Sequence, residues 1–273
     1  MVDRKRPQAP LLAWAALYAV IFILFVPLAM MILTSVLVKT EDGKMNFTWK
    51  FWLDVFADPQ LAQNVWNSLF IAAIASGIAV LLGTLAALAL AKTRFFGQRY
   101  LQIAASLSLV FPEIVFALSL LSLFFIINFP LGLGAVILAH ISFALPYVIL
   151  TVGARAVSLD KNIDDSAFDL GASDWQILTK IHLPLLKPAM ISGFFLSFIL
   201  SFDDFLITFF VNGVGSDTLP IKLYTSMKSG ITPQLNALAT IIFLASAILM
   251  IFLLRSQTFS QTLESLNQTK NLR

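Results

Sequence analysis

Three acidic residues lie in stretches of the sequence that are otherwise almost entirely apolar. Asp203 and Asp204 stand side by side in the run LSFILSFDDFLITFF, and Glu113 follows Pro112 in the run LVFPEIVFAL; neither run contains a Lys or an Arg. Because a carboxylate surrounded by hydrocarbon is costly by a few kcal/mol, such residues normally face a cavity, a partner or a transport pathway. The three acids are therefore candidates for contact with a cation. The alternative is that they are protonated and hydrogen-bonded for packing alone.

A stripe of small and polar residues accompanies the acid pair. At helical spacing, one helix face carries Gly193, Ser197, Ser201, Asp204 and Thr208. Such a stripe is typical either of close helix packing in lipid or of the wall of a water-filled passage. Packing gives Asp204 no role, so the passage is favoured, with Ser197 and Ser201 on its wall. Asp203 lies about 100° further round the helix, which puts one acid on the passage and the other at its edge or against a neighbouring helix.

The composition predicts that membrane-spanning helices position these residues. The 273 residues are 59% hydrophobic and 12% charged, with a mean hydropathy of +0.87, whereas soluble domains are about 25% charged. With no Cys, neither a disulfide nor a cysteine-based metal site can form. The predicted fold is all-α: a polytopic membrane protein with six transmembrane helices in a single domain over residues 1–273. The apolar segments long enough to cross a bilayer are residues 11–37, 66–91, 101–127, 133–154, 189–212 and 235–254.

The distribution of Lys and Arg predicts the topology. Thirteen of the 18 basic residues fall at the two ends of the chain and in the loops after the second and fourth spans, and five fall in the other loops. Since cytoplasmic segments carry the excess of positive charge, both termini are predicted to be cytoplasmic. On the opposite side, the aromatic-rich residues 46–67 form either a short surface helix leading into the second span or a loop with aromatic anchors. No pattern typical of nucleic-acid binding is present.

Two other polar features fall inside the predicted spans. Pro112 is expected to loosen the third span and free a backbone carbonyl, so that a carbonyl and the carboxylate of Glu113 together form a stopping point for a cation. His140 is a lone polar residue of the fourth span, near Ser142 and Pro146. We expect it to make an interhelical hydrogen bond rather than to act as a ligand.

The long loop between the fourth and fifth spans covers residues 160–187. Its first part is acidic, as helix starts prefer, and Gly171 is placed to turn the chain. Trp175, Leu178 and Ile181 then recur at a spacing of three, which predicts a second short amphipathic helix. Pro184 and Pro188 are expected to end that helix and to lead into the fifth span. Two short helices joined at a glycine indicate a knob that docks to a partner or lies on the lipid headgroups.

This loop, called the coupling loop below, resembles the EAA motif of bacterial ABC importer permeases, which runs E-A-A, three residues, G-A, and then a segment that ends in L-P. The positions of that motif are occupied here by Asp165, Ser166, Ala167, Gly171, Ala172, Leu183 and Pro184. Asp165 and Ser166 are mild departures, and the spacing is intact. In that family the loop forms the coupling helix, which sits in a groove of the ATP-hydrolysing subunit.

The resemblance extends over nearly the whole chain and is weakest in the first 60 residues. The segments FPEIV (111–115), SFDDF (201–205) and TLPIKLYTSMKSGITPQLNALATI (218–241) are similar to the C-type permease subunit of spermidine/putrescine importers. This implies the type I ABC importer permease fold and a multi-pass location in the bacterial inner membrane. It implies a permease subunit of an ATP-driven polyamine importer in which Asp203, Asp204 and Glu113 meet a polycationic substrate. Glu113, where some relatives carry Asp, puts the size of the substrate in question rather than its charge.

The same resemblance implies partners: a sister permease in a heterodimer, two cytoplasmic ATPase subunits, a periplasmic substrate-binding protein and membrane lipid. The chain has no G-x-x-x-x-G-K-[ST] motif, so it is expected to be no enzyme and to hold no cofactor, with ATP and Mg²⁺ bound by the ATPase. One alternative is an ABC permease for another cation. Another is a secondary transporter or channel, which leaves the coupling loop unexplained. An intramembrane aspartyl protease is disfavoured, because Asp203 and Asp204 diverge on one helix.

Overall fold

The computed structural model describes residues 11–39, 44–160, 162–228, 230, 232–245 and 247–248. They belong to two units, one made of the chain up to Pro59 and from Thr225 onward, the other of Gln60–Tyr224. Most described residues of each unit are helical, in agreement with the all-α prediction. The basic residues at positions 4–6 and 255–273 lie outside the described residues, so the cytoplasmic placement of the termini stays a prediction.

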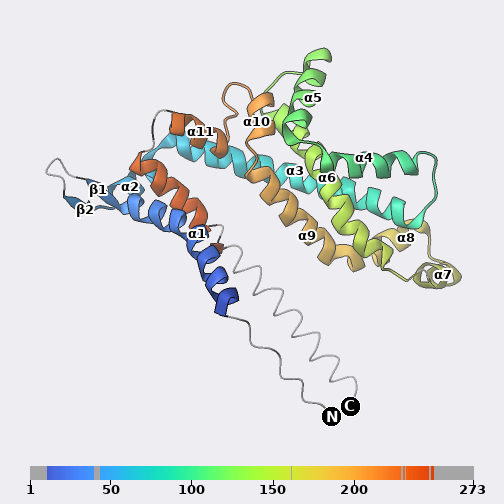
Figure 1. Ribbon diagram of the computed structural model, residues 1–273. Helices are drawn as coiled ribbons and strands as arrows, with labels where there is room; N and C mark the ends of the chain where they lie inside the picture. Colours follow the sequence, from blue (N-terminus) through green and yellow to red (C-terminus); the bar gives the residue numbers. More distant parts are fainter. Residues whose placement is uncertain are drawn as a thin grey trace, which may run out of the picture. The chain divides into compact units, whose positions relative to one another are not determined.

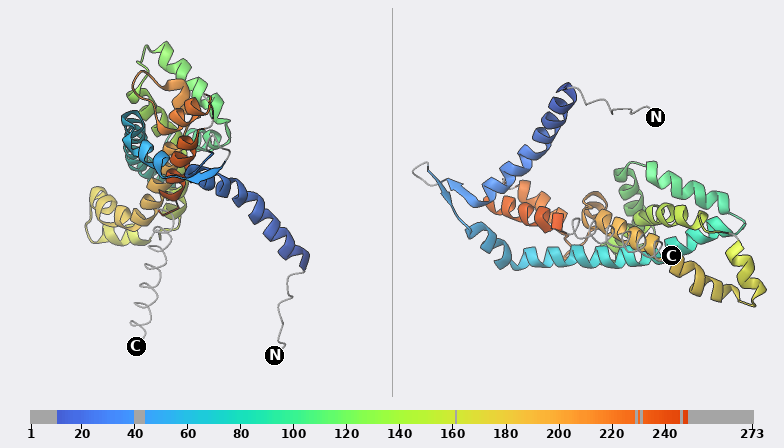
Figure 2. Two further views of the ribbon diagram at one scale, coloured as in Figure 1. Left: turned by 90° about the vertical axis from the view of Figure 1, so that its left-hand side faces the viewer. Right: turned by 90° about the horizontal axis from the view of Figure 1, so that it is seen from below.

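The first unit begins with a long apolar helix and a short hairpin (Figure 2). Its elements are α1 (Leu11–Val36), β1 (Leu37–Lys39), β2 (Met45–Phe47) and α2 (Lys50–Ala57). The strands pair antiparallel, with Leu37 opposite Phe47. Helix α2 confirms the short helix predicted within residues 46–67, and the indole N–H of Trp52 donates to Ser35 Oγ of α1 at 3.4 Å. Trp49 and Phe56 remain more than half exposed, as aromatic side chains at a lipid interface are.

The second unit holds most of the helices (Figure 1). They are α3 (Pro59–Lys92), α4 (Gln98–Val110), α5 (Glu113–Ile126), α6 (Leu133–Val157), α7 (Asn162–Asp169), α8 (Asp174–Ile177), the π-helical turn η1 (Leu178–His182), α9 (Leu183–Phe202) and α10 (Leu206–Val211). Helix α11 (Leu219–Lys228) crosses the boundary between the two units. The coupling-loop helices α7 and α8 lie at one end of the second unit, and α5 and α10 lie at the other (Figures 1 and 2).

Small side chains let α3, α6 and α9 approach closely, as they do in membrane helix bundles. One buried cluster joins these three helices: Ala79, Val80, Ala87, Leu88, Ala144, Val148, Val152, Ala156 and Leu186. The approach is tightest at Gly83, where an added Cβ would lie 2.6 Å from Cγ1 of Val148. A second cluster joins α3, α5, α6 and α10: Ile71, Ala117, Phe124, Ala135, Val136, Ala139, Ile207 and Val211. The two clusters fix the helices that carry the acidic residues.

The predicted spans correspond to these helices in different ways. Within the described part of the chain, four helices are long and apolar enough to cross a bilayer, at Ala13–Val36, Pro59–Lys92, Leu133–Val157 and Asp174–Phe202. The bent pair α4–α5 would supply a fifth. The sixth predicted span, residues 235–254, begins in a shorter apolar helix, Pro233–Ala245, and its residues after 248 lie outside the described residues. The count of six therefore stays a prediction.

Two predicted spans are broken helices. The third turns by 119° between α4 and α5, because the chain is extended at Phe111 and Pro112. Pro112 thus ends a helix outright instead of loosening it. The fifth span is interrupted at Asp203–Phe205, between α9 and α10. A continuous helix from residue 189 to 212 is therefore wrong.

The end predicted for the second coupling-loop helix is also wrong. Helix α8 continues through η1 into α9, so that Asp174–Phe202 runs as one helix. A π-helical turn accommodates the proline: the N–H of Leu183 donates to Leu178 O, five residues back. Pro184 directly follows this π-helical turn, so the helix passes the proline without ending.

Candidate functional site

The three acids predicted to meet a cation line one cavity of about 270 Å³. Glu113 comes from α5, and Asp203 and Asp204 come from the break between α9 and α10. The rest of its lining is apolar: Phe143, Ile199, Leu200, Phe205 and Leu206. None of the described Lys, Arg or His residues lines this cavity. The structure therefore brings together residues about ninety positions apart, and the charged groups on the wall are all carboxylates.

Both helix breaks of the second unit open onto this cavity. Glu113 is the first residue of α5, and Asp203 follows the last residue of α9. The C-terminal end of a helix presents carbonyl oxygens and a partial negative charge, which favours cations. Interrupted helices whose ends and side chains point at a solute are a common way to build a site inside a membrane protein. The breaks that the sequence analysis missed are thus what places the acids around one space.

The three carboxylates differ in how far they are free to bind a solute. Asp203 is exposed, and Glu113 is partly buried. Among the described residues, the side chain of Asp203 has no hydrogen-bond partner. Asp204 is different, with only 1% of its side chain exposed. Asp203 is therefore the acid most available to a substrate, and Asp204 is the least.

Asp204 holds the start of helix α10. Its Oδ1 accepts a hydrogen bond from the backbone N–H of Ile207 at 3.2 Å, and its Oδ2 accepts from the N–H and the hydroxyl of Thr208, each at 2.8 Å. A carboxylate that accepts from the first free N–H groups of a helix is a capping interaction, and the positive end of the helix dipole stabilises it further. The expectation that packing leaves Asp204 without a role is therefore wrong.

His140 of α6 completes this arrangement. Its Nε2 lies 3.1 Å from Asp204 Oδ2 and 3.0 Å from Thr208 Oγ1, and its Nδ1 lies 2.6 Å from Ser201 Oγ. The expected interhelical hydrogen bond is confirmed, and it is made to the predicted site. What the sequence analysis missed is the partner. The available signal was an Asp followed four residues later by Thr at a helix start, with a histidine at similar depth in the preceding span.

The small residues of the stripe pack towards helix α6 rather than towards the acidic cavity, whereas Asp204 of the same stripe lines that cavity. Ser197 is fully buried, Ser201 is 6% exposed, and neither lines that cavity. A Cβ built on Gly193 would contact Val148 and Val152 of α6. The close helix packing that the sequence analysis set aside therefore accounts for the glycine and the serines. The burial of Ser197 and Ser201 favours a packing role over a place on the cavity wall.

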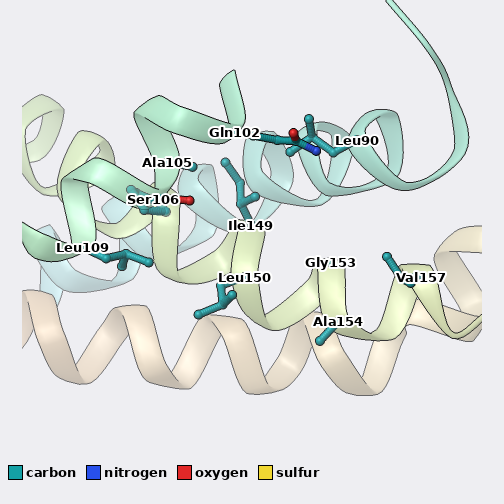
Figure 3. Close-up of a pocket in the computed structure, with 11 residues that line it drawn as sticks. Leu90, Gln102, Ala105, Ser106, Leu109, Ile149, Leu150, Gly153, Ala154 and Val157 are labelled. Carbon is teal, nitrogen blue, oxygen red and sulfur yellow. The ribbon is translucent and has the colours of Figure 1, made fainter. Parts of the chain in front are cut away.

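A second cavity, of about 370 Å³, lies between the end of α3, α4 and α6 (Figure 3). Its labelled lining is apolar apart from Gln102 and Ser106. Among the residues that the structure describes, no charged side chain lines it, so it provides no countercharge for a cation that has lost its water. Among the described residues, no group of three or more His, Asp or Glu is placed to hold a metal ion. The acidic cavity is therefore the better candidate despite its smaller volume.

The coupling-loop motif forms a compact turn. At the end of α7 the N–H of Gly171 donates to Phe168 O at 2.8 Å, and the N–H of Ala172 donates to Ala167 O at 3.0 Å. This is the hydrogen-bond pattern of a Schellman turn, and it requires the left-handed backbone that Gly171 adopts, with φ of +81°. Ser173 and Gln176 then form a capping box that starts α8. The residue spacing of the motif thus corresponds to the distance along the chain from the end of α7 to the start of α8.

An ion cluster ties the coupling loop to helix α3. Lys92 Nζ lies 2.9 Å from Asp164 Oδ2, and His182 Nε2 lies 2.7 Å from Asp164 Oδ1. Burial alone would raise the pKa of Asp164, but the hydrogen bonds and charges of Lys92 and His182 outweigh it and hold that pKa below its ordinary value. The cluster joins α3, α7 and η1, and the sequence analysis did not find it.

The sequence profile described as "Binding-protein-dependent transport system inner membrane component" matches residues 79–262, which is more than half of the chain. The chain belongs to this family. It is 37% identical to the spermidine/putrescine transport system permease protein PotC of Haemophilus influenzae, over 87% of this chain and 93% of that protein. It is 36% identical to the putrescine transport system permease protein PotI of Escherichia coli, over 80% and 81%. A permease of this family is a multi-pass protein of the inner membrane.

Solved structures confirm the type I ABC importer permease fold of this chain. A chain of a bacterial ABC transporter involved in the import of the acidic polysaccharide alginate aligns with a TM-score of 0.73 at 14% identity, covering 93% of this chain and 99% of that one. The alginate transporter in complex with a pentasaccharide-bound periplasmic protein gives a TM-score of 0.65 at 18% identity, covering 89% and 92%. Because the alginate transporter with this fold imports an acidic polysaccharide, the fold does not determine the charge of the substrate. That charge must be inferred from the side chains that line the site.

Proposed function

We propose that this permease forms, with a sister permease, the pathway by which an ATP-driven importer carries polyamines such as spermidine and putrescine into the cytoplasm. The observation that carries the proposal is the acidic cavity at the two helix breaks, with Glu113, Asp203 and Asp204 on its wall. The names of the relatives, which are polyamine permeases at 36–37% identity, support the same substrate.

The lining of the cavity matches the chemistry of a polyamine. Such a molecule alternates ammonium groups with short methylene segments. The exposed Asp203 and the half-buried Glu113 offer countercharges to the ammonium groups, while the apolar side chains and the faces of Phe143 and Phe205 suit the methylene segments and nearby cations. The contacts must be weak, because a deep binding well would trap the substrate instead of passing it on.

The coupling loop is the proposed contact with the ATPase subunits. Large apolar side chains project from its helices and turn: Phe168 is 51% exposed, Leu170 88% and Trp175 70%. Side chains of this kind form the buried centre of protein interfaces. Since the chain has no phosphate-binding loop of its own, ATP and Mg²⁺ would be held by the partner. The solved relative in complex with a periplasmic protein supports a binding protein as the source of the substrate.

The test is reconstitution of the complete importer. This chain, a sister permease, an ATPase subunit and a periplasmic binding protein are placed in proteoliposomes, and uptake of labelled putrescine and spermidine is measured with and without ATP. The proposal predicts ATP-dependent uptake that an excess of an anionic or neutral solute does not reduce. Uptake without the ATPase would indicate a secondary transporter. Uptake of a metal ion or a cationic amino acid in place of the polyamines would indicate another cationic substrate.

A further inference from the structure

We propose that His140 is a positioning residue that fixes Asp204 as the cap of α10 and thereby sets the shape of the substrate cavity. His140 belongs to α6, and its two ring nitrogens reach both sides of the break in the fifth span: Nδ1 to Ser201 of α9, and Nε2 to Asp204 and Thr208 beside and within α10. The inference rests on the proposed function, because substrate uptake is what reports on the cavity.

Burial makes this contact a rigid one. The side chains of His140 and Asp204 are each only 1% exposed, and Thr208 is fully buried. Buried polar groups that lose a partner leave another group unsatisfied, so the members of such a network hold one another in place. Asp204 is thus turned towards α6 and the first turn of α10, and the neighbouring Asp203 is left free at the cavity.

The break needs such a fixed point. Helix α9 ends at Phe202 and α10 begins at Leu206. The N–H of Asp203 still donates to Ile199 O and the carbonyl of Phe205 accepts from Phe209 N–H, but Asp203–Phe205 is not helical and would otherwise be free to take other paths. Asp204 supplies acceptors to the N–H groups of Ile207 and Thr208. His140 ties that cap to the packed centre of the unit through α6. The carboxylate of Asp203 therefore keeps its direction because its neighbour is held, although His140 itself does not line the cavity.

Two substitutions that differ only in reach test the assignment. In His140→Gln the amide lies near the place of Nε2 and can still donate to Asp204. In His140→Asn the shorter amide lies near the place of Nδ1, where it can meet Ser201 but not Asp204. The structure predicts that His140→Gln keeps KM for polyamine uptake within about threefold of wild type, whereas His140→Asn raises KM by about tenfold or more, with the basal ATPase rate unchanged in both.

A double-substitution cycle shows whether His140 acts through Asp204. If it does, His140→Asn combined with Asp204→Asn raises KM no further than Asp204→Asn alone, within about twofold. The positioning role would be overturned if the double variant raised KM by the product of the two single-variant factors. Equal KM values for His140→Gln and His140→Asn would also overturn it. If Asp204→Asn does not assemble, the comparison of Gln with Asn at position 140 decides alone. If the wild-type importer takes up no polyamine, the proposed function fails and this inference fails with it. If the wild-type importer takes up polyamine but the KM values of the variants differ from those expected, only the inference about His140 is refuted.

Discussion

Neighbouring acids should respond in opposite ways to the same substitution. Asp203→Asn changes an exposed side chain that lies on the cavity wall and has no hydrogen-bond partner among the described residues. Its effect on the free energy of unfolding should stay within about 0.5 kcal/mol, as for most surface changes. Asp204→Asn removes the charge from a buried group that accepts from Ile207, Thr208 and His140. Leaving these buried donors without their charged acceptor costs about 1–3 kcal/mol, a substantial part of the stability of most domains.

The assay measures folding and transport separately. The thermal midpoint of each variant is followed in detergent by size-exclusion chromatography after heating, and ATP-dependent polyamine uptake is followed in proteoliposomes. Asp203→Asn should melt like the wild type but transport poorly, because the cavity loses a countercharge. Asp204→Asn should melt several degrees lower and yield less assembled complex. A wild-type melting temperature for Asp204→Asn, or a wild-type uptake rate for Asp203→Asn, would refute this division of roles.

Three further predictions concern packing and the coupling loop. Gly83→Ala should destabilise the protein by about 1–3 kcal/mol in a melting assay, because the added Cβ would lie 2.6 Å from Val148. The control Gly77→Ala, where the added Cβ meets open space, should be neutral. Equal effects of the two substitutions would contradict the packing. Gly171→Pro should abolish co-purification with the ATPase, whereas Gly171→Asn, which tolerates a positive φ, should retain it; retention in both would show that the turn is dispensable. The pKa of Asp164 is lowered in the folded protein. Its contribution to the stability of the fold is therefore fully present above the ordinary pKa of an Asp, and it is lost as the pH falls through the lowered pKa. Melting of Asp164→Asn should therefore depend less on pH in that acidic range than melting of Asp165→Asn, and identical profiles would refute the ion cluster.

The sequence predicts the helices and the acids well because both follow from local rules. Runs of apolar residues need helices to cross lipid, and a carboxylate in such a run is rare enough to indicate a site. The breaks at Pro112 and at Asp203–Phe205 could not be predicted with the same ease, because apolar periodicity continues across them. Asp204 can take part in a helix or cap one, and only its contact with His140, sixty-four residues earlier, selects the cap.

In the coupling loop too, the sequence predicts local features better than contacts between distant segments. The turn at Gly171 follows from a single residue type, and the structure has it as predicted. The continuation of α8 into α9 depends on a π-helical turn at residues 178–182, which no short pattern indicates. The contact of Asp164 with Lys92 joins residues from two separate helices. Such contacts depend on how α3 packs against the loop, and a single sequence carries no direct record of that packing.

The central claim is that Asp203 lies in a water-filled passage that attracts cations, and cysteine labelling tests it directly because the chain contains no Cys. In the assembled importer, the Asp203→Cys variant is treated with cationic and anionic thiosulfonate reagents of similar size, and the fully buried Ser197→Cys variant serves as the control. We expect fast labelling at position 203, faster with the cationic reagent than with the anionic one because Glu113 and Asp204 remain. Polyamine should slow this labelling. No labelling is expected at position 197. Labelling at position 203 that is absent, or that does not distinguish the two charges, would contradict it.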